Sequence, residues 1–226
     1  VEPFFDPDTF TISYVVRAAG HPACAIIDPV LDYDPRAGRV ATRSAQKILD
    51  YVQSRQLRVE WILETHAHAD HLSAAQWLKQ RVGGQVGIGE HIREVQQYFA
   101  RLFDVEKEVP ADGSQFDRLL RDGDRLPLGD LMVEILHTPG HTNACVSYRV
   151  GDAVFVGDTL FMPDYGTART DFPGGDAATL YRSIRRILAL PAGTRLFLCH
   201  DYQPGGRPAA WETTVAEQRA HNLLVH

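Results

Sequence analysis

Histidine is concentrated at three places in this chain of 226 residues, and each place directly follows an apolar segment that is typical of a β-strand. Loops at strand ends are where rigid scaffolds place ligand-binding side chains. The spacing therefore predicts that strands from distant parts of the sequence end beside one another. Six of the ten histidines take part: His66, His68 and His71 in the first place, His137 and His141 in the second, and His200 in the third.

The first place has the pattern His-x-His-x-Asp-His. In an extended chain, side chains alternate between two faces, so His66 and His68 lie on the same side, and the turn that follows brings Asp70 and His71 toward the same point. Neutral imidazoles packed together without a metal would need several separate hydrogen-bond partners, and the Asp70 carboxylate would have a large desolvation cost. The segment therefore predicts a metal site.

The second place has a tight turn, Thr138-Pro139-Gly140, which directs His141 back toward the site. His137, at the end of the preceding strand, has two interpretations, a metal ligand or an ordinary strand residue. Asp158 follows a strand expected at residues 153–156, where an aspartate is disfavoured unless it has a partner. A cation would be that partner, and the alternative is a simple turn aspartate.

His200 follows an apolar strand expected at residues 196–199, so it has the same placement. Its neighbours Asp201 and Tyr202 add a carboxylate and a phenol. Strand ends and histidines thus coincide in all three places.

Hydrophobic periodicity predicts two successive blocks of strands followed by helices. Such blocks favour an α/β fold, an αββα sandwich of two mixed β-sheets packed face to face with helices outside, as a single domain over residues 1–226. Residues 105–124 have weak periodicity and are expected to be mostly loop. Strands are expected near residues 10–16, 23–27, 59–63, 86–88, 131–136, 144–149, 153–156 and 196–199, and helices near 42–55, from Asp70 to Gly83, 92–103, 177–190 and 211–222.

Composition excludes several classes of protein. Hydrophobic residues make up 44% of the chain, which excludes disorder, and no apolar run approaches the roughly 18 to 20 residues of a membrane span. A net charge of -6 without a basic run makes nucleic acid an unfavourable partner. Three widely spaced cysteines (Cys24, Cys145 and Cys199) form no disulfide framework and indicate a reducing, cytoplasmic location. The first residues lack the features of a signal peptide, although a leader already removed would leave no trace.

Four segments resemble, in identity and order, the metallo-β-lactamase superfamily. They are THAHADH at residues 65–71, TPGHT at 138–142, Gly157-Asp158 and His200. The resemblance covers nearly the whole chain and implies the αββα fold. Members of the superfamily include zinc hydrolases of lactams, glutathione thioesters and nucleic acids, and also iron enzymes, so membership alone is not a function.

Three further segments resemble the persulfide dioxygenase branch of that superfamily: GTARTDF at residues 166–172, TLY at 179–181 and HDY at 200–202. The segments MPDY at 162–165 and QPGGR at 203–207 are similar to a bacterial subgroup of these enzymes. Glyoxalase II thioesterases normally add a C-terminal helical domain, whereas about 25 residues follow His200, which argues against glyoxalase II. One departure is that Thr167-Ala168 stands where the family often has a cysteine near the arginine.

The resemblance implies one Fe(II) per chain, held by His66, His141 and Asp158. Two imidazoles and one carboxylate on one face of an octahedron leave three open positions for substrate and O₂. The implied reaction is the oxidation of glutathione persulfide by O₂ and water to sulfite and glutathione. In that case His68, Asp70, His71 and His200 surround the ligands, whereas in two-zinc relatives they bind the second metal.

The resemblance also suggests which residues meet the substrate. Arg169 would bind a carboxylate of glutathione, because its guanidinium matches that group bidentately, and the alternative is an ion pair with Asp171 or Asp176. Tyr202 would donate a hydrogen bond to oxygen or to the persulfide. Asp201 and Tyr202 are the catalytic candidates, and Arg207 is a further substrate candidate.

Two other functions stay open beside the dioxygenase. The first is a zinc-dependent glutathione thioester hydrolase similar to glyoxalase II, for which all the possible ligands are present. The second is a metal-storing or redox-sensing protein, against which the open ligand set argues. A homodimer is expected, with neither nucleic acid nor membrane as a partner.

Overall fold

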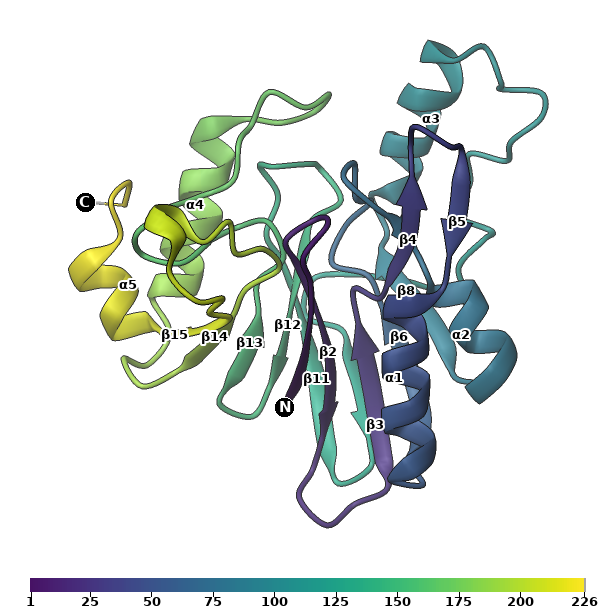
Figure 1. The fold of residues 1–226 in the computed structure, drawn as a ribbon. Helices are drawn as coiled ribbons and strands as arrows, with labels where there is room; N and C mark the ends of the chain where they lie inside the picture. Colours follow the sequence, from purple (N-terminus) through teal and green to yellow (C-terminus); the bar gives the residue numbers. More distant parts are fainter. Residues whose placement is uncertain (226) are drawn as a thin grey trace.

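The computed structural model describes residues 1–225, and its central feature is a pair of β-sheets packed face to face (Figure 1). The first sheet begins with an antiparallel meander and continues with parallel strands. Its parallel strands are buried on both faces, which explains why their sequences are continuous apolar runs rather than alternating ones. The strand order is β1 (Glu2–Asp6), β2 (Thr11–Arg17), β3 (Ala23–Ile27), β6 (Arg58–Leu63), β8 (Gln85–Gly89) and β9 (Arg118–Leu120).

The second sheet is antiparallel except for one parallel pair, β13 with β14. That pair has a consequence for function, because both strands end at the same edge and each is followed by a polar residue, Asp158 or His200. The strand order is β10 (Arg125–Leu128), β11 (Leu131–His137), β12 (Val146–Val150), β13 (Ala153–Phe155), β14 (Arg195–Phe197) and β15 (Glu212–Thr214).

Apolar side chains fill the space between the sheets, with Tyr14 and Ile27 of the first sheet packed in one cluster with Tyr148 and Phe155 of the second. The outer faces are covered by helices (Figure 1). Helices α1 (Arg43–Ser54) and α2 (Ala75–Val82) pack on the first sheet. Helices α4 (Ala177–Leu188) and α5 (Val215–His221) lie beside the second sheet, and α3 (Ile92–Leu102) lies at one end of the first. The αββα sandwich predicted from the sequence is confirmed.

A small third sheet lies at the rim of the molecule, where β4 (Val30–Asp34) pairs with β5 (Arg39–Ala41) and with β7 (Leu72–Ser73). The strand β7 corrects one prediction, because the sequence indicated a helix from Asp70 onward. Leu72 and Ser73 pair with β4 instead, and the Ser73 hydroxyl accepts from the Ala75 amide, so α2 begins only at Ala75.

The last expected helix, over residues 211–222, is also wrong at its start. Residues Glu212–Thr214 form β15 and pair with β14. Helix α5 then begins at Val215, where the Thr214 side chain accepts from the Glu217 amide and the Glu217 side chain accepts from the Thr214 amide. This capping box fixes the helix start more strongly than the hydrophobic pattern does. Within the predicted loop at 105–124, β9 is the one strand that the described residues form.

Within residues 1–225, no helix is both long and apolar enough to cross a membrane.

Candidate metal centre

A cluster of polar side chains lies where strands of both sheets end. The segment after β6 carries His66, the turn after β11 carries His141, and Asp158 and His200 follow β13 and β14. All four side chains are buried. The convergence of strands from distant parts of the sequence agrees with the spacing of the histidines, and it places the four side chains on rigid supports.

Three donor atoms form one compact group, from His66, His141 and Asp158, with all of them within 4.8 Å of one another. The Nε2 atoms of His66 and His141 lie 3.8 and 3.5 Å from Asp158 Oδ2. His200 Nε2 lies on the other side of the carboxylate, 3.5 Å from Asp158 Oδ1. Ligand atoms that share one metal at about 2.1 Å are separated by roughly 3.0 to 3.4 Å, so a small contraction would complete a site.

Each imidazole is oriented through its Nδ1 atom. His141 Nδ1 donates to the backbone carbonyl of Arg169 at 2.8 Å, and His66 Nδ1 lies 3.0 Å from the Thr65 hydroxyl. His200 Nδ1 lies 3.3 Å from the hydroxyl of Thr11 on β2. These contacts leave the Nε2 atoms facing Asp158, which is the arrangement that positions histidine ligands in metalloproteins.

The electrostatics of this group fit a cation. Burial, together with the neighbouring imidazoles, holds the pKa of His66 well below its usual value, so this ring is neutral and able to bind a metal. Asp158 Oδ1 is buried and has no hydrogen-bond partner among the described residues. An unpartnered buried carboxylate oxygen is costly, and a metal ion would satisfy it. The residues present therefore fit a bound metal.

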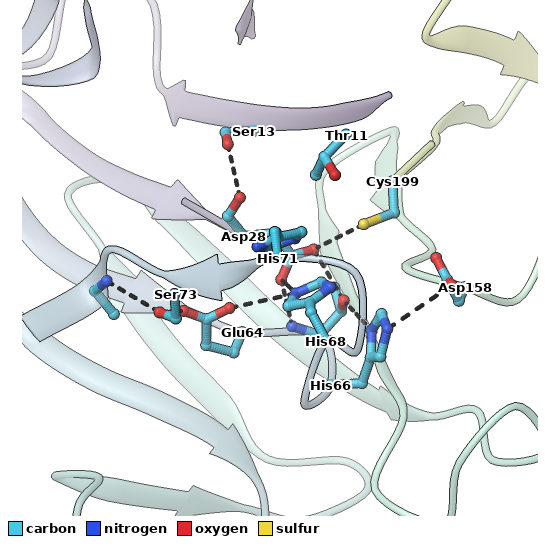
Figure 2. A network of polar contacts seen from close by, with 12 residues as sticks. Thr11, Ser13, Asp28, Glu64, His66, His68, His71, Ser73, Asp158 and Cys199 are labelled. Atoms are coloured by element: carbon cyan, nitrogen blue, oxygen red, sulfur yellow. Dashed lines mark hydrogen bonds and ion pairs between the residues drawn. The ribbon is translucent and has the colours of Figure 1, made fainter. Parts of the chain in front are cut away.

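His68 lies outside the group of three and belongs to a second polar network, which Figure 2 shows. Its Nε2 atom is 3.2 Å from Asp28 Oδ1 and 3.4 Å from Glu64 Oε2, and all three side chains are buried. Burial alone would lower the pKa of His68, but the two carboxylates outweigh it and raise that pKa well above its usual value. The pKa of Asp28 is lowered by His68 in spite of burial, so the two form a buried ion pair.

Asp70 and His71 lie close to His68 and to His200. Asp70 is partly exposed, and its Oδ2 is 3.6 Å from His200 Nε2. The Nε2 of His71 is buried and has no hydrogen-bond partner among residues 1–225, and burial lowers its pKa to about 3. Together with His68, Asp70 and His71 form a second compact group of possible metal donors.

A cavity of about 500 Å³ opens beside the group. Tyr202 lies in its wall between Tyr165 and His200, with ring centroids at 4.7 and 5.6 Å, and burial raises the pKa of its phenol, which therefore stays protonated. Arg169 also lines the cavity, with its guanidinium 4.6 Å from the centre of the Phe172 ring.

The two arginine side chains near the site, Arg169 and Arg207, form ion pairs with aspartates. Arg169 Nε lies 2.6 Å from Asp171 Oδ1, the ion pair that the sequence offered as an alternative, and the side chain remains largely exposed. Arg207 donates to both oxygens of the buried Asp201 and to both oxygens of Asp164. Asp201 also accepts from the Ala210 amide and is not among the residues that line the cavity.

His137 is an ordinary strand residue. It ends β11, its Nε2 lies 2.9 Å from the Asn143 carbonyl oxygen, and its ring stacks on His91 at 4.7 Å. All three cysteines are buried, and none forms a disulfide within residues 1–225. Cys199 is the cysteine closest to the polar network, with its sulfur 3.7 Å from Asp28 Oδ2.

The sequence interpretation missed Asp28 and Glu64. Asp28 follows the strand expected at residues 23–27 and Glu64 precedes the histidine motif, and neither position by itself indicates a site. The one local signal was the Asp28-Pro29 pair, since an aspartate that ends a strand needs a partner. That partner, His68, is 40 residues away.

Comparison with known proteins agrees with this geometry. A family model described as the metallo-β-lactamase superfamily matches residues 7–200, which contain every side chain of the cluster. The chain belongs to this superfamily.

The relatives that match this chain are named after different activities. A probable metallo-hydrolase of Burkholderia pseudomallei is 56% identical over 235 residues, covering 100% of this chain and 80% of the relative. A Dictyostelium discoideum protein called glyoxylase B2 is 46% identical, covering 98% and 77%. The mitochondrial persulfide dioxygenase ETHE1 of Bos taurus is 30% identical, covering 96% and 72%. The chain spans about half the length of β-lactamase hydrolase-like proteins from Agrobacterium fabrum and Xylella fastidiosa, which are 52% identical to it.

Solved structures of the superfamily are similar over the whole chain. The crystal structure of ETHE1 from Myxococcus xanthus has a TM-score of 0.79 and 29% identity, covering 99% of this chain and 83% of the other. The protein TTHA1623, solved in a di-iron-bound form, has a TM-score of 0.72 and 27% identity, covering 99% of each chain.

Proposed function

We propose that this chain is a persulfide dioxygenase with one Fe(II) held by His66, His141 and Asp158. The observation that supports it best is the composition of the compact donor group, two imidazoles and one carboxylate, with His68 outside it. This is the ligand set of non-haem iron oxygenases, which leaves positions open on one side of the metal. The relatives called persulfide dioxygenase add a reason to choose this reaction.

In the proposed reaction, glutathione persulfide, O₂ and water give glutathione, sulfite and two protons. The terminal sulfur is oxidised and O₂ is reduced. When bound, Fe(II) would supply the redox chemistry that brings the sulfur and O₂ together. The protein supplies binding, orientation and exclusion of water.

Three side chains that line the cavity have separate roles in the proposed reaction. The Arg169 guanidinium binds a carboxylate of glutathione, exchanging its exposed contact with Asp171 for a bidentate one. The protonated phenol of Tyr202 donates a hydrogen bond to the persulfide or to oxygen. Phe172 packs edge-on against His141, with centroids 5.0 Å apart, and keeps water from that side of the ligand.

Asp201 and Arg207 act indirectly, by holding other residues in position. Their ion pair, with Asp201 fully buried, fixes the segment that carries His200 and Tyr202. We assign Asp201 to holding Tyr202 in position, and Arg207 to holding Asp201, because both of its amino groups are already bound to carboxylates.

A second function is favoured by a specific observation. Asp70 and His71 form a second compact donor group with His68 beside the first, and Asp70 Oδ2 lies 3.6 Å from His200 Nε2. These side chains are donors for a second metal, and one relative is called glyoxylase B2. With two zinc ions the same site would hydrolyse glutathione thioesters.

One experiment separates the two functions. The protein is purified anaerobically, metal per chain is determined, and O₂ uptake is followed with glutathione persulfide. One iron per chain with rapid O₂ uptake and equimolar sulfite is the expected result. Two zinc ions per chain, hydrolysis of S-lactoylglutathione and no O₂ uptake would contradict the dioxygenase. Variants His66→Ala and His141→Ala should lose the iron, with Arg149→Ala as a control far from the site.

A further inference from the structure

Glu64 is a buried carboxylate beside the metal group to which no role has been assigned. It follows β6 directly, two residues before His66. Its backbone is fixed by two other strands, since its amide donates to the Gly87 carbonyl at 2.9 Å and its carbonyl accepts from the Tyr148 hydroxyl at 2.6 Å. A residue held this firmly projects its side chain in one defined direction.

The Glu64 side chain is directed at His68. Figure 2 shows the carboxylate between Ser73 and His68, with the Ser73 hydroxyl donating to one oxygen and the imidazole contacting the other. Ser73 is itself held in β7, which pairs with β4. The carboxylate therefore has little freedom to move away from the ring.

Asp28 contacts the same nitrogen of His68. Its two carboxylate oxygens accept from the amide and the hydroxyl of Thr65, at 2.7 and 2.8 Å, and its Oδ1 is 3.2 Å from His68 Nε2. Asp28 has a φ of 48°, a left-handed conformation that residues other than glycine adopt at a cost. The chain thus keeps a strained backbone in order to present this carboxylate.

These contacts influence how many protein ligands a bound metal would have. His68 is the second histidine of the motif, only two residues from His66, and its ring lies 4.1 Å from the His66 ring. To join the compact group, the imidazole would have to move away from two buried carboxylates. Leaving a buried charge without its partner is strongly unfavourable.

We propose that Glu64 is a positioning residue which, together with Asp28, holds the His68 ring out of the donor group, so that a metal there has three protein ligands and not four. The inference rests on the proposed function. A fourth protein ligand would occupy a position needed by substrate or O₂ and would favour the tetrahedral coordination typical of zinc. Glu64 in this way selects which of the two chemistries the site performs.

Cobalt(II) tests the proposal without turnover. The purified protein is stripped of metal, loaded with one Co(II) per chain, and its visible absorption is recorded, because four-coordinate Co(II) absorbs several-fold more strongly than six-coordinate Co(II). X-ray absorption then counts the imidazoles on the metal. We expect weak absorption and two imidazoles in the unmodified protein, and several-fold stronger absorption with three imidazoles in Glu64→Leu.

Two variants serve as controls. Glu64→Gln keeps an oxygen at the position of Oε2, 3.4 Å from His68 Nε2, and should give the spectrum of the unmodified protein. Glu60→Leu makes the same exchange on the same strand, at a residue that pairs with Arg58, and should also leave the spectrum unchanged.

The outcomes separate the two claims. Strong absorption in the unmodified protein, or a Glu64→Leu spectrum that does not change, overturns the role of Glu64 even when O₂ uptake is normal. Two zinc ions per chain as isolated, with no O₂ uptake, overturns the proposed function instead. The unmodified protein alone decides between these results if Glu64→Leu does not fold.

Discussion

Asp158 contacts three imidazoles with two oxygens, and that arrangement explains why a single carboxylate dominates the site. Its Oδ2 faces His66 and His141, and its Oδ1 faces His200. The position of one carboxylate therefore links the first donor group to the residues that surround it. Replacing it would remove the negative charge that three neighbouring donors share.

Arg169 allows the proposed metal binding and the proposed substrate binding to be tested separately. Its carbonyl oxygen accepts from His141, whereas its guanidinium is exposed at the cavity. Arg169→Ala keeps the carbonyl and loses the guanidinium, so we expect KM for glutathione persulfide to rise by about 10- to 100-fold, the loss of one charge-assisted bidentate contact. Bound iron should stay at the level of the unmodified protein.

Steady-state kinetics with metal analysis on the same sample would check this. Arg182→Ala, an exposed arginine whose Nη2 donates to the Thr179 hydroxyl, is the control and should leave KM unchanged. Loss of iron in Arg169→Ala, or an unaltered KM, would show that the guanidinium has a structural role only.

The sequence predicts a metal site but not its surroundings. Placement at strand ends indicates a metal site, but the choice of His66, His141 and Asp158 as its ligands comes from the resemblance to the persulfide dioxygenase branch. Glu64 and Asp28 could not be singled out, since acidic residues beside strands are common and only the fold brings Asp28 and His68, 40 residues apart in sequence, into contact.

The turn before His141 depends on its contact with helix α4. Gly140 has a φ of 136°, and a Cβ atom there would lie 2.3 Å from the backbone of Leu180. Gly140→Ala must therefore push α4 and the turn apart. We expect a loss of about 2 to 4 kcal/mol in the free energy of unfolding, together with weaker metal binding, because His141 would shift.

Urea unfolding and a metal titration of the variant provide the measurements. Gly193→Ala is the matched control, since a Cβ atom at Gly193 meets no atom within 4 Å and its backbone is unstrained. Equal stability of the two variants would mean that the turn adapts without moving α4.

The segment after β14 is held by a buried ion pair. Asp201 has a side chain that is 0% exposed, and Arg207 is its charged partner at 2.7 Å. Arg207→Ala leaves this carboxylate buried without a counter-charge, so the free energy of unfolding should fall by about 3 kcal/mol. Arg149→Ala removes an exposed pair with Glu134 and should cost less than about 1 kcal/mol. Similar losses in the two variants would argue against this role.

The main strands and helices follow from hydrophobic periodicity, whereas the short strands do not. β7 has two residues and β15 has three, too few to show a period, and both exist because a neighbouring strand offers hydrogen bonds. The start of α5 is set by the pairing of Thr214 with Glu217 rather than by apolar residues.

The whole molecule has its metal group at the seam between the sheets, with His66 from the first sheet and His141 and Asp158 from the second. A ligand that binds only the folded state stabilises it by mass action, by about 2.7 kcal/mol at a hundredfold excess over its Kd. Removing the metal with a chelator should therefore lower Tm by about 5 to 10 °C for a chain of this size.

Differential scanning calorimetry before and after chelation, and after iron is restored, would measure this difference. The Asp158→Asn variant is the control, because its Tm should not respond to iron. A Tm that chelation leaves unchanged would mean that the two sheets hold the site in place without help from the metal.

The pairing of β2 with the segment around His200 has a consequence for biosynthesis. Ile12 and Asp201 donate to the carbonyls of Cys199 and Phe10, so the beginning and the end of the domain meet beside the ligands. A ribosome releases the first histidine motif long before Asp158 and His200. A metal can therefore enter the proposed site only after Asp158 and His200 have left the ribosome, and a shortage of that metal would leave folded apoprotein.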